Sequence, residues 1–268
     1  MERQGDEVVY EVREHVAWIT LNRPERMNTI SRDMLERLSE LLLRARGDQE
    51  VRVIVLTGTG RAFCAGLDLR RGPEGGSKGI LDPDAPVRTT IDLRQAPPTV
   101  LHELDKPTIC ALNGSAAGYG FDLAMGCDVR LMAQEAKLSA AFTRRGIVPE
   151  SGGTWLLPRL LGWAKAAELI FTGRTLSASE SLDLGLVSRL CPAAELADAA
   201  RALAAEMAAS APLAVQAAKR MMRMGLNEPF NEHVHHVYLQ LLPLMRTEDQ
   251  REGMAAFMEK REAIFNGR

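Results

Sequence analysis

The sequence lacks several features that would assign the chain to a common functional class. Its four cysteines lie far apart without a C-x-x-C pair, which argues against a structural zinc site and a disulfide framework. No apolar run approaches the ~18 residues that span a bilayer. The first ten residues, MERQGDEVVY, contain no apolar signal core. We therefore expect a cytoplasmic protein of a reducing compartment that does not enter a membrane.

The sequence also lacks an excess of charge of either sign, because its 33 Lys and Arg residues nearly balance its 35 Asp and Glu residues. No block of like charge stands out along the chain. A nucleic-acid-binding protein is expected to carry a basic stripe, so this balance argues against a nucleic-acid partner. The hydrophobic fraction of 46% is ordinary for a globular protein with a sizeable core.

Two glycine-rich turns follow apolar strands but complete no nucleotide-binding or hydrolase motif. In GTGRAFCAG the third glycine of G-x-G-x-x-G is replaced by Phe63, and the phosphate loop G-x-x-x-x-G-K-[ST] is absent. Ser115 in the second turn is not the centre of G-x-S-x-G. The histidines of HVHH at 233–236 match no zinc-site spacing, so we expect no metal site.

The opening third of the chain alternates between strand and helix patterns. Period-two alternation predicts antiparallel strands at Val8–Arg13 and Val16–Asn22. Ser31 is a suitable N-cap for the amphipathic helix that follows, and VRVIVLTGTG predicts a buried strand. Residues 71–100 are rich in Gly, Pro and charge, which predicts a loop.

A second unit of strand, glycine turn and helix follows this loop. KPTICALNG predicts a buried strand with its turn, and a helix is expected over residues 120–126. DVRLMAQ and AKLSAAF are expected to form a further strand pair. From Ser151 onward the patterns are helical. The sequence thus indicates an α/β protein with a sheet-rich core over about 1–150 and helices after it.

Two acids are candidates for catalysis. Asp122 falls in the first turn of the helix expected at 120–126, and Glu150 precedes another helix start. Acids at helix starts are also favoured by the free N–H groups and the helix dipole. A purely structural role is therefore as open as a catalytic one when these acids are considered alone.

The chain resembles the crotonase (enoyl-CoA hydratase/isomerase) superfamily through seven blocks in the family's order. These blocks are ITLNRPERMNTIS, VRVIVLTGTGRAFCAGLDL, KPTICALNGSAAGYGFDLAMGCDVRL, GIVPESGGTWLLPRLLG, TGRTLSASESLDLGLVSRL, APLAVQAAKR and EGMAAFMEKREAIF. The resemblance implies a ββα spiral core over residues 1–200 that carries the acyl-CoA site, and a helical trimerisation region over 201–268. It also implies a homotrimer or a dimer of trimers, an acyl-CoA substrate, and no cofactor apart from the coenzyme A of that substrate.

The resemblance further implies that the backbone N–H groups of Leu67 and Tyr119 hold the thioester oxygen of an enolate. Asp122 matches the first of two glutamates that handle water in hydratases, and the second falls at Phe142, which cannot bind or activate water. Glu150 occupies the position of the acid in some enoyl-CoA isomerases. The favoured hypothesis is therefore an isomerase-like double-bond shift with Glu150 as the proton shuttle. Asp122 would be a second acid or would hold Glu150 or a water.

Two alternative functions stay open. A further set of residues is expected to contact the acyl chain or the coenzyme A. Asp122 and Glu150 could share the roles in hydration of a trans-2-enoyl-CoA, or the chain could be a non-catalytic acyl-CoA binder. Tyr119 and Phe142 are expected to line the acyl pocket. The resemblance implies coenzyme A contacts from five residues, the last two often reaching a neighbouring subunit's site: Arg26, Ala65, Arg70, Phe257 and Lys260.

Overall fold

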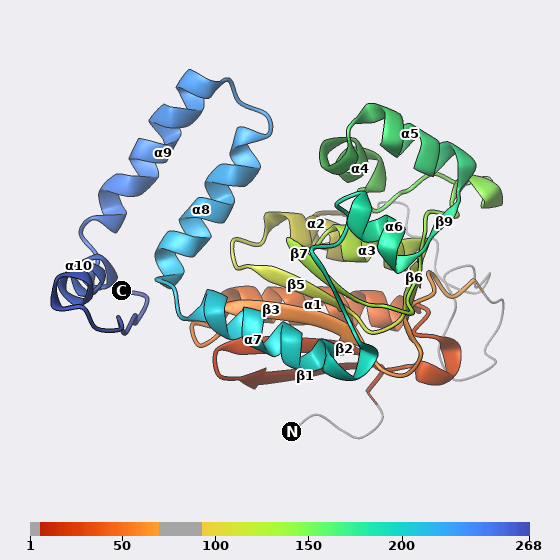
Figure 1. Ribbon diagram of the computed structural model, residues 1–268, viewed down its shortest axis with the longest axis horizontal. Helices are drawn as coiled ribbons and strands as arrows, with labels where there is room; N and C mark the ends of the chain where they lie inside the picture. The colour runs from red at the N-terminus through yellow and green to blue at the C-terminus, as the bar shows by residue number, and fades with distance from the viewer. Residues whose placement is uncertain (1–5, 70–92) are drawn as a thin grey trace.

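The strands of the described chain form two sheets (Figure 1). The computed structural model describes residues 6–69 and 93–268. The larger sheet has the order β1-β2-β3-β5-β7-β10, with strands Val8–Arg13, Val16–Leu21, Val53–Gly58, Thr108–Leu112, Val129–Ala133 and Arg189–Cys191. The smaller sheet has the order β4-β6-β8-β9, with strands Ala62–Cys64, Ser115–Ala117, Leu138–Ser139 and Thr175–Leu176.

Seven of the ten described α-helices lie after residue 150. The ten helices are α1 (Arg32–Gly47), α2 (Pro97–Glu103), α3 (Tyr119–Met125), α4 (Gly153–Leu161), α5 (Trp163–Thr172), α6 (Ala178–Asp183), α7 (Leu196–Ala208), α8 (Pro212–Gly225), α9 (Phe230–Leu244) and α10 (Glu248–Glu259). A short 3-10 helix, η1 (Pro24–Arg26), follows β2. Each α-helix in the described ranges is too short or too polar to cross a membrane.

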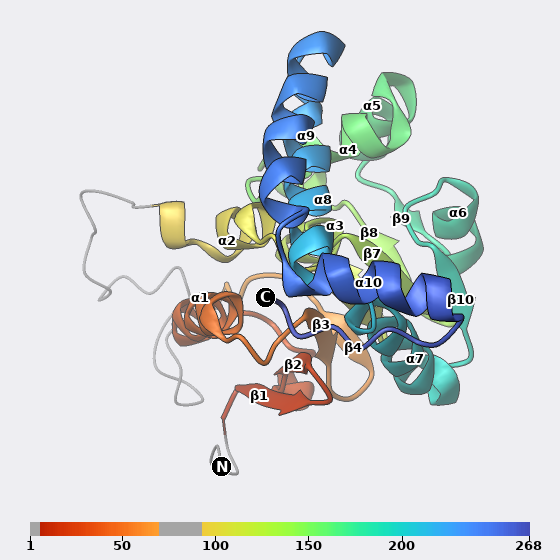
Figure 2. The same ribbon diagram turned by 90° about the vertical axis from the view of Figure 1, so that its left-hand side faces the viewer.

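The opening of the chain folds as its pattern predicts. β1 and β2 are antiparallel, with Val8 opposite Leu21, which confirms the two predicted strands. The Ser31 side chain caps α1 by accepting a hydrogen bond from the Met34 N–H at 3.2 Å, as predicted. α1 and α7 lie on opposite faces of the larger sheet in Figures 1 and 2, so the sheet is buried from both sides.

The predicted pairing of the two strands after α3 is wrong, although both strands exist. β7 pairs with β5 and β10 in the larger sheet, whereas β8 pairs with β6 and β9 in the smaller one. The chain repeatedly leaves the larger sheet for the smaller one, from β3 to β4, from β5 to β6 and from β7 to β8. Alternation of apolar residues shows that a strand forms, but it does not show which sheet the strand joins.

The predicted loop over residues 71–100 is wrong at its end, because α2 begins at Pro97. Proline fits the first turn of a helix, where its missing N–H has no intrahelical partner. The part of that prediction up to residue 92 lies outside the described residues. The helical prediction for the C-terminal part also omitted two short strands, β9 and β10.

The C-terminal helices extend to one side of the sheets. α7 still packs across β2, β3, β5 and β7, so the expected boundary between residues 200 and 201 falls within a helix of the core. α8 and α9 pack together beyond it, and α10 lies at the far left of Figure 1. α8 is tied back to the core because Asp105 binds both Arg220, at 2.6 Å, and Arg223, at 2.9 Å.

Close packing of α3 against β4 depends on Gly120. A Cβ atom at this position would overlap the Cys64 carbonyl oxygen and lie 2.6 Å from the Cys64 Cβ. We expect Gly120→Ala to lower the free energy of unfolding by about 1–3 kcal/mol or more, because backbone must shift to relieve the overlap. Gly126→Ala at the end of the same helix is the control, since its Cβ would meet its nearest neighbour at an ordinary 3.5 Å. Equal melting temperatures for the two variants would contradict this packing.

Candidate active site

The segment that contains Leu67 lies beside Ile30, in the connection between η1 and α1. The Ile30 N–H donates to the Gly66 carbonyl at 2.8 Å, and the Asp68 N–H donates to the Ile30 carbonyl at 2.8 Å. This parallel bridge uses the residues on either side of Leu67 and leaves the Leu67 N–H outside the pairing. Gly66 has φ of +111°, a conformation that favours glycine.

The start of α3 touches this segment through two glycines. A Cβ at Gly66 would lie 3.2 Å from the Ala117 carbonyl oxygen and 3.9 Å from the Tyr119 nitrogen. A Cβ at Gly118, whose φ is +53°, would lie 4.0 Å from the Gly66 Cα. Tyr119 is the first residue of α3, where N–H groups have no intrahelical acceptor and the dipole favours negative charge. The Leu67 and Tyr119 amides therefore occupy adjoining turns, as an oxyanion site requires.

Asp122 lies one turn into α3 and is only 1% exposed. Its Oδ2 accepts hydrogen bonds from the Ser151 N–H at 3.1 Å and the Gly153 N–H at 3.4 Å. Burial raises the pKa of Asp122 to about 7; the two N–H donors oppose the shift, and the nearby charge of Glu150 adds to it. Gly153 permits this contact, because a Cβ there would overlap Asp122 Oδ1.

Glu150 stands immediately before the backbone that Asp122 holds. Its side chain is exposed, in contrast to that of Asp122, and its charge acts on both Asp122 and Tyr119. The structure thus brings together four predicted site residues: Leu67 and Tyr119 by their backbone, and Asp122 and Glu150 by their carboxylates. Asp122 fixes the Ser151 and Gly153 amides, so it is placed to hold Glu150 in position.

The raised pKa of Asp122 predicts a pH-dependent stability. The unfolded group ionises near 3.8 and the folded group near 7, so the folded protein binds more protons between these values and loses stability as the pH rises through them. Asn imitates the protonated acid and avoids this loss. We expect the free energy of unfolding of Asp122→Asn relative to wild type to increase by up to roughly 4 kcal/mol between about pH 4 and pH 8, at about 1.4 kcal/mol for each unit of pKa difference.

Chemical denaturation at several pH values measures this difference, and Asp183→Asn on the exposed side of α6 is the matched control. A constant difference between wild type and Asp122→Asn over the whole range would show that Asp122 is ionised throughout.

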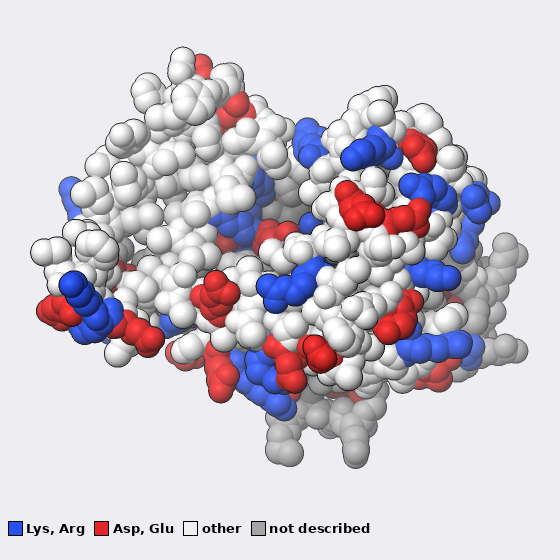
Figure 3. Space-filling model, viewed as in Figure 1, with Lys and Arg blue, Asp and Glu red and all other residues white. Residues whose placement is uncertain are grey.

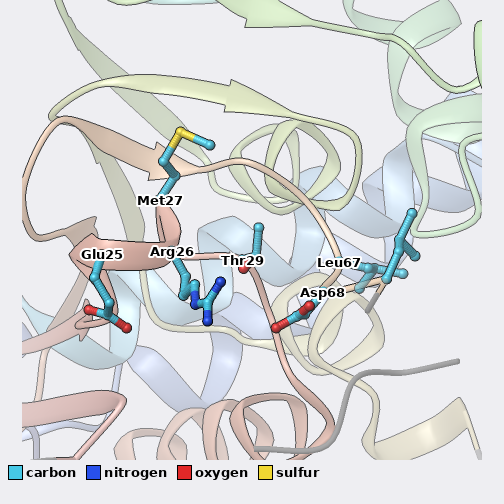
Figure 4. Close-up of a pocket in the computed structure, with 7 residues that line it drawn as sticks. Glu25, Arg26, Met27, Thr29, Leu67 and Asp68 are labelled. Atoms are coloured by element: carbon cyan, nitrogen blue, oxygen red, sulfur yellow. The ribbon is translucent and has the colours of Figure 1, made fainter. Parts of the chain in front are cut away.

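A surface pocket of about 490 Å³ adjoins the Leu67 segment (Figure 4). Arg26 of η1 lines it, and Figure 4 shows its side chain between those of Glu25 and Asp68. Leu67 lines the same pocket, and the Ala65 N–H donates to the Met27 carbonyl at 3.0 Å. Two predicted coenzyme A contacts, Arg26 and Ala65, therefore lie next to the predicted oxyanion donor. An arginine there suits a phosphate group.

A buried ion pair that includes Asp68, a residue lining this pocket, was missed by the sequence reasoning. Arg23 and Asp68 are each 3% exposed, and Arg23 Nη1 lies 3.0 Å from Asp68 Oδ2. Arg23 also donates to the Thr29 carbonyl at 3.1 Å and lies 3.1 Å from Glu7 Oε1. The pair fixes the turn that carries Arg26 against the segment that carries Leu67. The position of Asp68 directly after a predicted oxyanion donor was the available signal.

Two predicted ligand contacts, Phe257 and Lys260, are not joined to this site within the described part of the chain. Phe257 is 78% exposed on α10 and Lys260 ends that helix, on the side of the molecule that faces the viewer in Figure 2. Arg70 lies outside the described residues. Phe142 is 1% exposed in the same hydrophobic core cluster as Tyr119.

Two of the HVHH histidines stabilise the connection between α8 and α9. His233 and His236 each share a hydrogen bond through Nδ1 with Glu228 Oε2, at 3.2 and 3.0 Å, which closes the connection between α8 and α9. Among the residues that the structure describes, no cluster of three or more His, Cys, Asp or Glu could hold a metal ion.

Two glycine turns in close approach lie near a pair of carboxylates, an arrangement compatible with an enzyme that stabilises an oxyanion and moves a proton. The family model described as enoyl-CoA hydratase/isomerase matches residues 11–268. The (E)-benzylidenesuccinyl-CoA hydratase of Thauera aromatica is 37% identical over 262 residues, which cover 97% of this chain and 99% of that protein. The 1,2-epoxyphenylacetyl-CoA isomerase of Escherichia coli K12 is 35% identical over 268 residues, which cover 97% of this chain and 98% of that protein.

Solved structures agree with the sequence comparisons. The crystal structure of an enoyl-CoA hydratase from Bacillus anthracis superposes with a TM-score of 0.86 at 33% identity, over 98% of this chain and 100% of that one. The chain belongs to the enoyl-CoA hydratase/isomerase family, within the crotonase superfamily. The predicted family and fold class are confirmed, and the chain is an acyl-CoA-processing enzyme of this family. A non-catalytic acyl-CoA binder finds no support.

Proposed function

We propose that the protein shifts the double bond of an enoyl-CoA thioester through an enolate. The observation that carries this proposal is the close approach of the turns at Gly66 and Gly118, because each glycine directly precedes one of the two proposed oxyanion donors, Leu67 and Tyr119. Asp122 holds the backbone directly after Glu150 against the same helix. The proposed oxyanion donors and the proposed proton carrier, Glu150, would therefore both lie near the start of α3.

In the proposed reaction, the Glu150 carboxylate takes a proton from C2 of a 3-enoyl-CoA. The electron pair of that C–H bond moves into the thioester carbonyl and forms a dienolate, whose oxygen accepts hydrogen bonds from Leu67 and Tyr119. Glu150 then returns the proton to C4, and the double bond forms between C2 and C3. The reaction balances without any oxidant or reductant, so it needs no cofactor besides the coenzyme A of the substrate.

Asp122 contributes by position and by charge. Its Oδ2 fixes the Ser151 and Gly153 amides, and a pKa of about 7 leaves it partly protonated at neutral pH. A neutral neighbour does not repel the charge of Glu150, whereas a second full negative charge would. The geometry therefore supports Glu150 as the acid that transfers the proton, and Asp122 as the residue that positions it.

Hydration is the second candidate, and one observation favours it. Asp122 Oδ1 is buried without a hydrogen-bond partner in the described part of the chain, so it could hold a water beside Glu150. The two named relatives are a hydratase and a 1,2-epoxyphenylacetyl-CoA isomerase, so membership of the family does not decide between hydration and a double-bond shift.

Mass spectrometry of the products separates the two reactions. We expect a 3-enoyl-CoA to become its 2-enoyl isomer with no change in mass. A product heavier by one water, formed from a 2-enoyl-CoA at a rate above that of the double-bond shift, would contradict the proposal and favour hydration.

We also propose that the C-terminal helices form the contact between subunits of a homotrimer or a dimer of trimers. Large apolar side chains on these helices are strongly exposed, among them Met222, Phe230, Phe257 and Met258. The surface over α8 and α9 carries few charged side chains in Figure 3. In such an assembly Phe257 and Lys260 could reach a neighbouring subunit's coenzyme A.

A further inference from the structure

Ile30 holds both peptide groups that flank Leu67. The Ile30 N–H donates to the Gly66 carbonyl at 2.8 Å, and the Asp68 N–H donates to the Ile30 carbonyl at 2.8 Å. The Gly66 carbonyl and the Leu67 N–H belong to one peptide group, which is planar and trans, so the two bonds point in opposite directions. The Leu67 N–H is therefore directed away from Ile30 for as long as these two hydrogen bonds persist.

The bridge between Ile30 and Leu67 is short. It is a single parallel bridge that lies outside the two sheets of the described chain. Gly66 precedes Leu67 with φ of +111°, and glycine restricts the backbone less than any other residue. A small rotation at Gly66 would redirect the Leu67 N–H, so the segment has to be fixed on its other side, where Asp68 lies.

The Asp68 carboxylate is anchored by Arg23. Both side chains are 3% exposed, and Arg23 Nη1 lies 3.0 Å from Asp68 Oδ2. The same guanidinium donates to the Thr29 carbonyl at 3.1 Å and lies 3.1 Å from Glu7 Oε1. Burial of two charges costs about as much as their attraction returns, so an intact buried pair contributes little to the free energy of unfolding. What it supplies to the segment is a fixed geometry.

Arg23 is itself fixed by a strained turn. Met27 and Asn28 have φ of +52° and +54°, in the left-handed region that is unfavourable for residues with a Cβ. Asn28 is buried, its Oδ1 accepts from the Arg23 N–H at 2.7 Å, and its Nδ2 donates to the Ala62 carbonyl at 2.8 Å. The turn is therefore held against β4, and it presents Arg23 to Asp68 from a fixed position.

We propose that Asp68 is a positioning residue of the oxyanion site, which acts through Arg23 to fix the direction of the Leu67 N–H. The inference rests on the proposed function, in which this N–H donates to the enolate oxygen. Loss of one oxyanion donor costs about 10²–10³ in kcat, and a displacement of about 1 Å costs up to about 10². We therefore expect Asp68→Asn to lower kcat by about tenfold to 10²-fold, with KM little changed.

Vibrational spectroscopy of a bound ligand tests this inference without turnover. Butyryl-CoA has no double bond to shift, and isotope-edited infrared difference spectra report the stretching frequency of its thioester carbonyl. Hydrogen bonds to the carbonyl oxygen lower this frequency. We expect wild type to lower it relative to the free ligand. We expect Asp68→Asn and Arg23→Gln each to lose about half of that lowering, because one of the two donors is displaced.

Asp128→Asn is the matched control. Asp128 lies 2.7 Å from Lys219 of α8 and accepts from the Thr108 N–H of β5 at 2.7 Å, so it removes a paired acid outside the Leu67 segment. This variant should keep the wild-type carbonyl frequency and the wild-type kcat. The signal comes only from ligand bound to folded protein, so a variant that merely unfolds more easily would keep the full lowering.

The full wild-type lowering in either Asp68→Asn or Arg23→Gln overturns the inference and leaves the oxyanion site in place. A rise in KM of Asp68→Asn with kcat unchanged overturns it as well, because Asp68 would then serve only to bind the substrate. An unshifted carbonyl in wild type would show that Leu67 and Tyr119 are not donors, which overturns the oxyanion site and the inference together. The failure of the inference alone is thus distinguishable from the failure of the proposed function.

Discussion

Glu150→Gln is expected to reduce kcat by about 10²–10⁴-fold, because the amide has the same size but cannot carry a proton between two carbons. The side chain is exposed and makes no contact that the fold requires, so the variant should fold normally. Proton transfer occurs only on the way to the transition state. The loss should therefore appear equally in kcat and in kcat/KM, with KM little changed.

Steady-state assays with a 3-enoyl-CoA measure this effect. Glu135→Gln, on the exposed connection between β7 and β8, is the matched control and should retain wild-type turnover. Full activity in Glu150→Gln would show that Glu150 does not transfer the proton, and Asp122 would then be the candidate.

Tyr119→Pro is expected to reduce kcat by about 10²–10³-fold, because proline removes the backbone N–H that holds the enolate oxygen. The first helical position tolerates proline well, since its N–H has no acceptor within the helix. The preceding residue also tolerates it. Gly118 has ψ of −124°, outside the α region that a following proline disfavours.

Tyr119→Ala separates the backbone from the side chain. This variant loses the same ring but keeps the N–H, so its kcat should exceed that of Tyr119→Pro by most of the expected factor. Circular dichroism should show the same helix content for both variants. Equal kcat values in two well-folded variants would mean that the Tyr119 amide does not stabilise the reaction.

The sequence predicts most of what is local in this fold. The alternation at Val8–Arg13 and the cap at Ser31 act over a few residues, and both are confirmed. The helix expected over residues 120–126 is found at Tyr119–Met125, with Asp122 near its start as expected. These signals depend on hydrogen bonds and packing within a single element.

Contacts between distant segments were harder to predict. The hydrogen bonds from the Ser151 and Gly153 amides to Asp122 join two helices, and no local pattern contains both partners. The buried pair of Arg23 and Asp68 has the same character. The packed fold decides which strands pair in a sheet and which charged residues form an ion pair. A local residue pattern shows only that a strand or a charge needs a partner.

Proton exchange at C2 of the substrate tests the central claim most directly. The protein is incubated in deuterium oxide with a 3-enoyl-CoA, and deuterium at C2 and C4 is followed by mass spectrometry and nuclear magnetic resonance. We predict that wild type transfers or exchanges protons at both carbons, and that Glu150→Gln and Tyr119→Pro slow this by at least about 10²-fold. Proton exchange at C2, or the double-bond shift itself, at the wild-type rate in Glu150→Gln would contradict an enolate formed by Glu150.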